Sequence, residues 1–425
     1  MDKNSIAVGI DIGTSQVRCV IGRIDEDTEL RPTIIGVGSV KSVGMRKGEV
    51  VKVDEVANSI NQAIAIAQQT AGVNVNSATI NINGPHLISL NSKGVIAVNP
   101  QDGSIDISEL ERVEEAATLV RIPDNREIIQ VFARNYRLDG QKIKNPIGMK
   151  GVRLEVDAHV VTALTPVLGA LMDSAGVAGI GVDNHLLSTV ATSDLILTNE
   201  QKENGVAVVD FGASTINLAV YEEEDLQLVS VIPIGSANIT NDLAIGLQTE
   251  LVIAEEVKTS YATLVKSKLD KKDTSKTVEV KHGDTKHVFE KKLIKDIVES
   301  RVDEILELID KELHKIKRSA KLPGGVVFMG GGSQMTGLVE YSKSQLRLPV
   351  HMAKIGQFTG ISEDIEDISF ATATGLMIQD AILEHQSQDN GPKRKNRGST
   401  PKLNMSAAGG KAKSLARGVI GRFKS

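Results

Sequence analysis

Residues 9–22 read GIDIGTSQVRCVIG, in which a short apolar run ends in an acid, a glycine and two hydroxyl residues before apolar residues resume. Residues 208–221, VVDFGASTINLAVY, repeat this pattern and align with the first stretch without a gap, so that Asp11 matches Asp210. Self-similarity of this kind indicates a duplicated structural unit. The sequence therefore predicts two copies of one strand–turn–strand unit, one at the start of each half of the chain.

The turn within each copy suits a bound polyphosphate. A tight turn with glycine lets backbone N–H groups approach an oxyanion, and Ser and Thr hydroxyls add donors. Since carboxylates and phosphates are both anionic, Asp11 and Asp210 are expected to hold Mg²⁺ through its waters instead. An ordinary hairpin turn is the alternative for either copy alone, whereas two copies at equivalent places favour a clamp that grips a polyphosphate from both sides.

A third glycine-rich motif and a charged pair complete the expected ligand site. Residues 324–337 form an apolar strand that ends in Gly330, Gly331, Gly332 and Ser333. A backbone without side chains can lie flat against a base or ribose. Glu255 and Lys258 share one helix face, where they could contact ribose hydroxyls and the purine. A solvated ion pair is the alternative that the local sequence favours for them, and the G-x-x-x-x-G-K-[ST] motif is absent from the sequence.

Composition narrows the class of protein. The 425 residues suffice for one large or two medium cores. A lone Cys19 predicts a reducing compartment. The N-terminus has no signal-peptide features, and the lack of an 18-residue apolar run predicts no membrane span. Ten Lys and Arg follow Asp389 without any acid, so the formal total of −5 leaves about −15 for residues 1–389. An acidic body argues against nucleic acid as its partner.

Apolar β-rich runs alternate with helical patterns, which predicts an α/β fold. A helix is expected at 53–71, and residues 79–163, with short strand-like runs and one helix at 107–120, predict a compact α+β insert. Residues 164–195 predict helix, strand and helix in turn, from the segments TPVLGALMDSA, IGVDN and HLLSTVATSDLIL, so that the last helix would begin at His185. Residues 277–289 predict a hairpin.

The two D-x-G turns and the strand that ends in GGGS resemble the actin, Hsp70 and sugar-kinase superfamily. Within it, the chain resembles the FtsA family of bacterial cell-division proteins over nearly its whole length. The motifs that carry this resemblance are GIDIGTSQV (9–17), NPIGMKG (145–151), GVAVVDFGASTINLAVY (205–221), NDLAIGLQTELVIAEEVK (241–258), VVFMGGGSQMTGL (326–338) and KSLARGVIGRFKS (413–425). The resemblance implies a two-lobed, actin-like α/β fold with ATP in the cleft, and an α+β insert subdomain characteristic of FtsA.

The resemblance also implies a role for each motif residue. It implies a first phosphate loop of Asp11, Gly13, Thr14 and Ser15, a second of Asp210, Gly212, Ala213, Ser214 and Thr215, and adenosine contacts from Gly330, Gly331, Gly332 and Ser333, with Glu255 and Lys258 at the ribose and base. The implied cofactors are ATP and Mg²⁺, with Asp11 and Asp210 holding the metal.

Two positions depart from the family pattern. Many relatives have Lys after the first loop, where this chain has Gln16, so one positive charge near the phosphates is lost. Asn184 aligns with the Gln that orients water in actin-like ATPases and is one methylene shorter. With Asp210 and Asn184 as the expected catalytic residues, both departures favour a nucleotide-binding switch, at most a weak ATPase.

Patterns and resemblance together predict the domain boundaries. The first lobe comprises residues 1–78 and 164–200, and an inserted self-association subdomain comprises residues 79–163. The second lobe comprises residues 201–386, with an outer subdomain at about 247–325. A disordered basic linker follows at 387–412, and an amphipathic membrane-targeting helix at 413–425.

The C-terminal segment is predicted to be the membrane anchor. At about 100° per residue, its apolar side chains fall within one arc, and its cations lie outside that arc. The residues expected at the membrane are Leu415, Arg417, Val419, Ile420, Arg422 and Phe423. A basic polar face opposite apolar side chains is typical of an interfacial helix on anionic lipids.

The expected function is that of an ATP-binding, actin-like division protein. It would polymerise on the cytoplasmic face of the cell membrane at the division septum and tether FtsZ filaments there. The implied partners are the FtsZ C-terminal tail, further copies of the chain, anionic lipids and other division proteins, with Arg301 placed to pair with the acidic FtsZ tail. A pilus-assembly protein of this fold, which lacks such a tail, and a sugar kinase, for which no acidic base can be placed, are the alternatives.

Overall fold

The computed structural model describes residues 5–24, 32–98, 104–265, 276–283, 285–356, 358–361 and 365–389. These residues form two compact units. The first unit takes the described residues of 1–85, 169–224 and 228–381, and the second takes those of 86–168, 225–227 and 382–389. Most of both predicted lobes lies in the first unit, whereas residues 164–168, 225–227 and 382–386 of the predicted lobes fall in the second.

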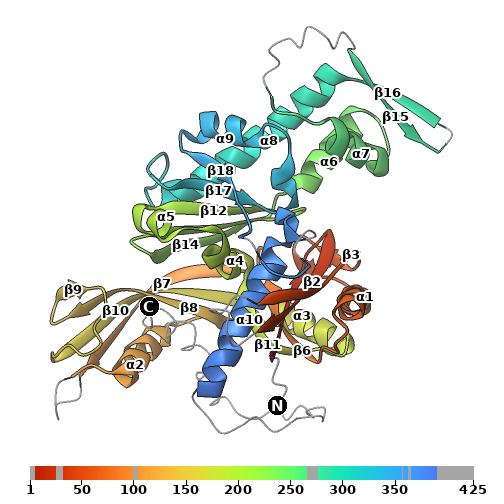
Figure 1. Cartoon of the computed structure of the whole chain (residues 1–425). Coiled ribbons are helices and arrows are strands. Elements are labelled where there is room, and N and C mark those ends of the chain that lie inside the picture. Colours follow the sequence, from red (N-terminus) through yellow and green to blue (C-terminus); the bar gives the residue numbers. More distant parts are fainter. Residues whose placement is uncertain are drawn as a thin grey trace. The chain divides into compact units, whose positions relative to one another are not determined.

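The first unit contains a five-stranded sheet built on the first copy of the repeat (Figure 1). Its strand order is β11 (Gly181–Leu187), β6 (Ser77–Ile82), β1 (Ser5–Ile12), β2 (Gln16–Ile24), β3 (Thr33–Lys41). β1, β2 and β3 are antiparallel neighbours, whereas β6 and β11 run parallel to β1. β1 is thus the central strand, and its C-terminal end carries Asp11.

The second copy forms a second five-stranded sheet with the same order. That order is β18 (Val350–Met352), β17 (Gly325–Met329), β12 (Val206–Phe211), β13 (Ile216–Glu222), β14 (Asp225–Ile232). β12 pairs antiparallel with β13 and parallel with β17, as β1 does with β2 and β6. The predicted duplication is therefore confirmed, and Asp210 on β12 holds the place of Asp11.

Helices cover these sheets. α1 (Val53–Ala71) has the predicted bounds, buries Val56, Ile60 and Ala63 at the helical period, and packs on β2 and β3. The remaining helices that lie wholly or mostly in this unit are α3 (Thr165–Val177), α4 (Ser188–Ile196), α5 (Asn199–Asn204), α6 (Ser236–Gly246), α7 (Leu251–Tyr261), α8 (Lys291–Lys315), α9 (Leu338–Leu346), α10 (Ala371–Asp389) and the short η1 (Gly331–Gln334) and η3 (Ile368–Phe370).

Two hairpins extend from this scaffold. β15 (Thr277–His282) and β16 (Thr285–Glu290) form the hairpin that the sequence predicts at 277–289, beside α7 and α8. β4 (Met45–Arg46) and β5 (Glu49–Val50) form a shorter hairpin between β3 and α1.

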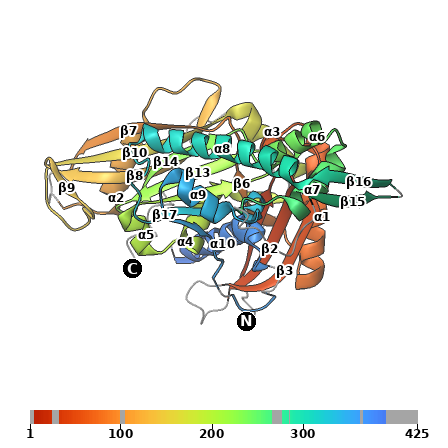
Figure 2. The same ribbon diagram turned by 90° about the horizontal axis from the view of Figure 1, so that it is seen from above.

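The long helix α8 supplies much of the core of the second sheet. Its apolar face buries Ile294, Val298, Val302 and Ile305 among the strand residues. Figure 2 shows α8 lying across this sheet. One predicted boundary was wrong, because residues 185–187 continue β11 in parallel pairing with β6 and the helix α4 begins only at Ser188.

The second unit is an α+β structure, as predicted for the insert. Its antiparallel sheet has the order β7 (Ile88–Ala97), β10 (Arg153–Leu164), β8 (Arg126–Leu138), β9 (Gln141–Ile143), and α2 (Ile107–Thr118) packs on it. The Asp106 side chain caps α2 by accepting from the N–H groups of Ser108 and Glu109.

The predicted linker and anchor lie mostly outside the described residues. α10 continues to Asp389, three residues into the predicted linker, and residues 390–425, including the whole predicted membrane helix, are outside the described ranges. Among the helices of the described residues, none is long and apolar enough to cross a bilayer.

Candidate functional site

The turns that follow β1 and β12 have the same geometry. In the first, the Gly13 N–H donates to the Gln16 carbonyl at 3.1 Å, and in the second the Gly212 N–H donates to the Thr215 carbonyl at 3.0 Å. Each turn joins two antiparallel strands directly after an aspartate. The duplicated sequence thus forms duplicated turns.

The two turns meet in the first unit. The Ser214 hydroxyl donates to Thr14 Oγ1 at 2.8 Å, and the same Thr14 oxygen accepts from the Gly48 N–H at 3.1 Å. The structure therefore brings the two predicted phosphate loops face to face, although they are almost 200 residues apart in sequence.

Two carboxylates precede these turns, Asp210 buried and Asp11 half-buried. Asp11 Oδ1 accepts from Asn81 Nδ2 at 2.6 Å, and Asp210 Oδ2 accepts from Asn217 Nδ2 at 2.9 Å. Burial raises the pKa of Asp11 to about 7, against a favourable charge from Arg18 and with an added rise from the nearby Asp210. Burial likewise raises the pKa of Asp210 to about 6, opposed by the Asn217 hydrogen bond and by Arg18. The hydrogen bonds and charges of the protein alone therefore do not fully offset the cost of desolvating these two carboxylates.

Arg18 is a site residue that the sequence did not reveal. It stands directly opposite Asp11 in the β1–β2 pairing, as Asn217 stands opposite Asp210 in the β12–β13 pairing. Its guanidinium carbon lies 5.3 Å from the centre of the Phe370 ring, and its Nε is buried without a hydrogen-bond partner. The identical seven-residue offset in both copies is the signal that could have identified it.

The arrangement fits a hydrated divalent cation beside a phosphate. Among the described residues, no group of three or more His, Cys, Asp or Glu side chains could hold a metal. Two carboxylates with raised pKa values suit Mg²⁺, which keeps several waters and takes its remaining ligands from phosphates. The unpartnered Arg18 Nε and Asn217 Oδ1 leave one buried donor and one buried acceptor for such a ligand shell.

The third motif serves two purposes. A Cβ on Gly330 would lie 2.4 Å from Asp210 Oδ1, and one on Gly332 would lie 2.7 Å from the Phe211 ring, so both glycines are needed for packing against the end of β12. A Cβ on Gly331 would meet nothing within 4 Å. Ser333 is buried, and its hydroxyl donates to the Gly330 carbonyl at 2.6 Å. Gly331 is therefore the glycine of this motif that faces open space.

Glu255 and Lys258 form an ion pair that is attached to the second turn through α6. Lys258 Nζ lies 2.7 Å from Glu255 Oε2 and donates to Thr240 Oγ1 at 2.9 Å. The first N–H groups of α6, those of Ser236 and Ala237, donate to the carbonyls of Gly212 and Ala213 at 3.0 and 2.7 Å. The pair is thus held against α6 and is not merely solvated.

Two predicted residues, Asn184 and Arg301, lie away from the two turns, and the side chain of Gln16 at the end of the first turn points elsewhere. Asn184 on β11 is level with Thr79 on β6, two residues before the row that holds Asn81 and Asp11. Gln16 turns toward β3, where its Oε1 accepts from the Ser39 hydroxyl at 2.9 Å. Arg301 lies on α8 and is considered below. The six predicted membrane residues lie outside the described ranges.

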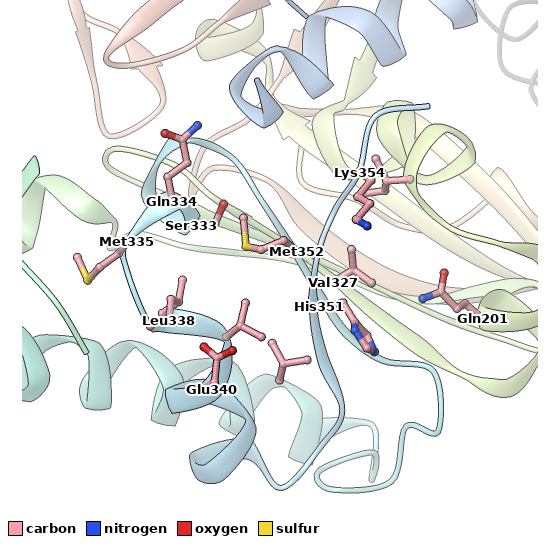
Figure 3. Close-up of a pocket in the computed structure, with 14 residues that line it drawn as sticks. Gln201, Val327, Ser333, Gln334, Met335, Leu338, Glu340, His351, Met352 and Lys354 are labelled. Atoms are coloured by element: carbon pink, nitrogen blue, oxygen red, sulfur yellow. The ribbon is translucent and has the colours of Figure 1, made fainter. Parts of the chain in front are cut away.

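A pocket of about 640 Å³ lies next to the third motif (Figure 3). Its wall includes Ser333 and Gln334 of that motif together with Leu338, His351 and Met352. Neither Asp11 nor Asp210 lines it. The pocket is therefore distinct from the site between the two turns.

Family models match most of the chain. Residues 207–375 match the model described as "Cell division protein FtsA", and residues 84–162 match an "SHS2 domain inserted in FTSA". The chain is 33% identical to the cell division protein FtsA of Pseudomonas aeruginosa over 380 residues, which cover 89% of this chain and 90% of the relative. It is 32% identical to the protein of the same name from Bacillus subtilis, with coverage of 89% and 84%.

Solved structures show the fold. A PilM–PilN type IV pilus biogenesis complex matches with a TM-score of 0.64 at 16% identity, over 88% of this chain and 98% of that chain. MreB5 of Spiroplasma citri bound to ADP matches with a TM-score of 0.54 at 12% identity, over 91% and 99%. The fold is thus actin-like, as predicted.

Proposed function

This chain belongs to the FtsA family of cell division proteins, and we propose that it binds ATP and Mg²⁺ between its two duplicated turns, polymerises on the cytoplasmic face of the cell membrane and tethers FtsZ filaments there. The observation that carries the nucleotide part is the Ser214–Thr14 contact, which joins the two turns that follow Asp11 and Asp210. A polyphosphate that enters between the turns would replace this hydroxyl contact with hydrogen bonds to itself.

Each part of the site has a role in this proposal. Asp11 and Asp210 would hold Mg²⁺, which supplies positive charge to the phosphates. The charge of Arg18 lowers the pKa of both carboxylates and so favours their ionised, metal-binding form. Gly331 offers an open backbone surface to the adenosine. The neighbour MreB5 has been solved with ADP, which supports nucleotide binding by the fold.

The proposed nucleotide role is that of a switch, with slow hydrolysis at most. Fast phosphoryl transfer requires a residue that orients the attacking water beside the phosphates. Asn184 is level with Thr79, two residues away from the row of Asp11. This placement favours slow hydrolysis. A sugar kinase is disfavoured because no acidic base for a sugar hydroxyl can be placed in the sequence, and membership of the FtsA family disfavours both that role and a pilus-assembly role despite the fold shared with PilM.

Membrane attachment is proposed for residues 413–425. Their sequence places Leu415, Val419 and Phe423 on one face of a helix, with Arg417 and Arg422 outside it. One such segment binds weakly, and a polymer that presents many copies would bind stably through avidity.

Phe423→Glu is expected to release the full chain from anionic liposomes, because a buried aromatic side chain contributes about 1.5–3 kcal/mol at the headgroup boundary. Flotation with ATP and liposomes that contain phosphatidylglycerol measures this. Leu403→Glu is the matched control, since it adds the same charge to the basic segment outside the predicted helix. Equal flotation of Phe423→Glu and the parent would exclude the tail as the anchor.

The FtsZ tail is proposed to bind the outer subdomain near Arg301. The Arg301 guanidinium bonds to both carboxylate oxygens of Asp242 on α6, with Nη2 at 2.8 Å from Oδ1, and also contacts Glu304. About a fifth of its side chain is exposed, so an acidic peptide could compete for its remaining donors.

Self-association is proposed for the second unit, which has a hydrophobic core of its own.

Arg301→Glu is expected to weaken a fluorescent FtsZ-tail peptide about tenfold, or about 1.4 kcal/mol, because it reverses the charge that faces the acidic peptide. Fluorescence anisotropy measures the affinity. Arg318→Glu is the control, since Arg318 also bonds to both carboxylate oxygens of one glutamate, Glu222, and about a third of its side chain is exposed. An equal loss in both variants would indicate general charge reversal instead of a contact at Arg301.

A further inference from the structure

The β4–β5 hairpin reaches the point where the two turns meet. Its two strands pair antiparallel around a two-residue loop, Lys47–Gly48. The Gly48 N–H donates to Thr14 Oγ1 at 3.1 Å, and a Cβ on Gly48 would lie 3.4 Å from Thr215 Cγ2. The hairpin tip is therefore hydrogen-bonded to the first turn, and a side chain added at Gly48 would reach the second.

The hairpin is also fixed at its base. The N–H groups of Val51 and Lys52 both donate to the Gly44 carbonyl, at 2.8 and 3.1 Å. Just before the hairpin, the Ser42 N–H donates to the Ser15 carbonyl of the first turn at 2.9 Å. A hairpin that is anchored at both ends presents its tip at a defined place and loses little entropy when a ligand binds there.

Lys47 is an unusual residue for this tip. Lys47 and Gly48 both have positive φ, 51° and 79°, as the central residues of a type I′ turn require. Asn-Gly is the preferred pair in such a turn, and a lysine in the left-handed region is strained. Lys47 is exposed, and in the described part of the chain its side chain makes no salt bridge or hydrogen bond. The fold therefore does not explain the choice of lysine.

We propose that Lys47 is a phosphate-binding residue, whose ammonium group pairs with the polyphosphate held between the two turns. The proposal rests on nucleotide binding at this site. A lysine offers a charged donor on a long flexible stem, and phosphate oxygens are suitable acceptors for it. Lys47 thus supplies, from a neighbouring hairpin, the positive charge that Gln16 does not provide after the first turn.

The test is calorimetric titration of the full chain with Mg·ATP, Mg·ADP and adenosine. Lys47→Asn removes the charge and supplies the residue that the turn prefers, so the hairpin is retained. It should weaken Mg·ATP about tenfold, weaken Mg·ADP by less and leave adenosine unchanged, whereas Lys47→Arg should bind Mg·ATP within about threefold of the parent. Arg46→Asn, an equal charge loss on the same hairpin, is the matched control and should have little effect.

The outcomes separate this inference from the function on which it rests. If the parent binds neither Mg·ATP nor Mg·ADP, nucleotide binding itself is wrong. If the parent binds and Lys47→Asn binds equally well, Lys47 is not a phosphate ligand and the proposed function stands. An equal loss with adenosine, or an equal loss in Arg46→Asn, would also overturn the inference, because it would indicate a distorted site or a general charge effect.

Discussion

Asp210→Asn should lower the affinity of the chain for Mg·ATP by roughly 100-fold, the upper end of what an outer-shell partner of a bound metal contributes. The substitution keeps the shape of the side chain and an oxygen that can accept from Asn217, but it removes the charge that would hold Mg²⁺. Since burial raises the pKa of Asp210, the same change removes a poorly solvated charge. The Tm of the nucleotide-free chain at pH 8 should therefore stay constant or rise.

Calorimetry with Mg²⁺ or with EDTA measures the affinity, and Asp54→Asn, on an exposed aspartate in the first turn of α1, is the control.

The pH dependence of stability and of Mg·ATP affinity provides a second measurement. Because folding raises the pKa of Asp11 from 3.8 to about 7, the folded chain binds more protons than the unfolded chain between about pH 4 and 7, so its stability falls as pH rises through that window. Mg·ATP must displace those protons, so the parent should bind it at least about tenfold more weakly at pH 5.5 than at pH 8. A flat pH profile, or unchanged affinity in Asp210→Asn, would contradict the metal assignment.

Gly330→Ala and Gly331→Val should have opposite consequences, although the two glycines are adjacent. Gly330 has φ 84° and ψ 164°, a region open essentially to glycine alone, and its Cβ would lie 2.4 Å from Asp210 Oδ1. Backbone strain and overpacking of about 1–3 kcal/mol each should lower the free energy of unfolding by about 2–6 kcal/mol. Gly331→Val places its side chain in open space, so it should leave stability unchanged and block adenosine.

Chemical denaturation and adenosine titration distinguish the two effects, with Gly331→Ala as a smaller probe of the same space. The assignment of this backbone to the nucleotide would be wrong if Gly331→Val bound ATP like the parent. A stable Gly330→Ala variant would show instead that η1 can move away from β12.

The duplicated fold could be predicted from the sequence, because both copies of the turn carry their aspartate, glycine and hydroxyl residues in a continuous stretch. Arg18 was missed because its partnership with Asp11 depends on the strand register that the turn sets, and only the seven-residue offset shared by both copies hints at that register in the sequence. Lys47 was missed for a similar reason, because only the folded hairpin brings it to the two turns. The sequence also could not show that Gly330 and Gly332 are required by Asp210 and Phe211.

Helix α6 belongs to two sites at once. Its first N–H groups bond to the carbonyls of the second turn, and farther along the same helix Asp242 holds Arg301 of α8. Because an α-helix tends to move as a rigid body, a displacement of the second turn would move Asp242 with it. Under the proposed function, a ligand that displaced the turn would therefore also alter the Arg301 surface, and by reciprocity whatever factor one ligand imposed on the affinity of the other would be returned in equal measure.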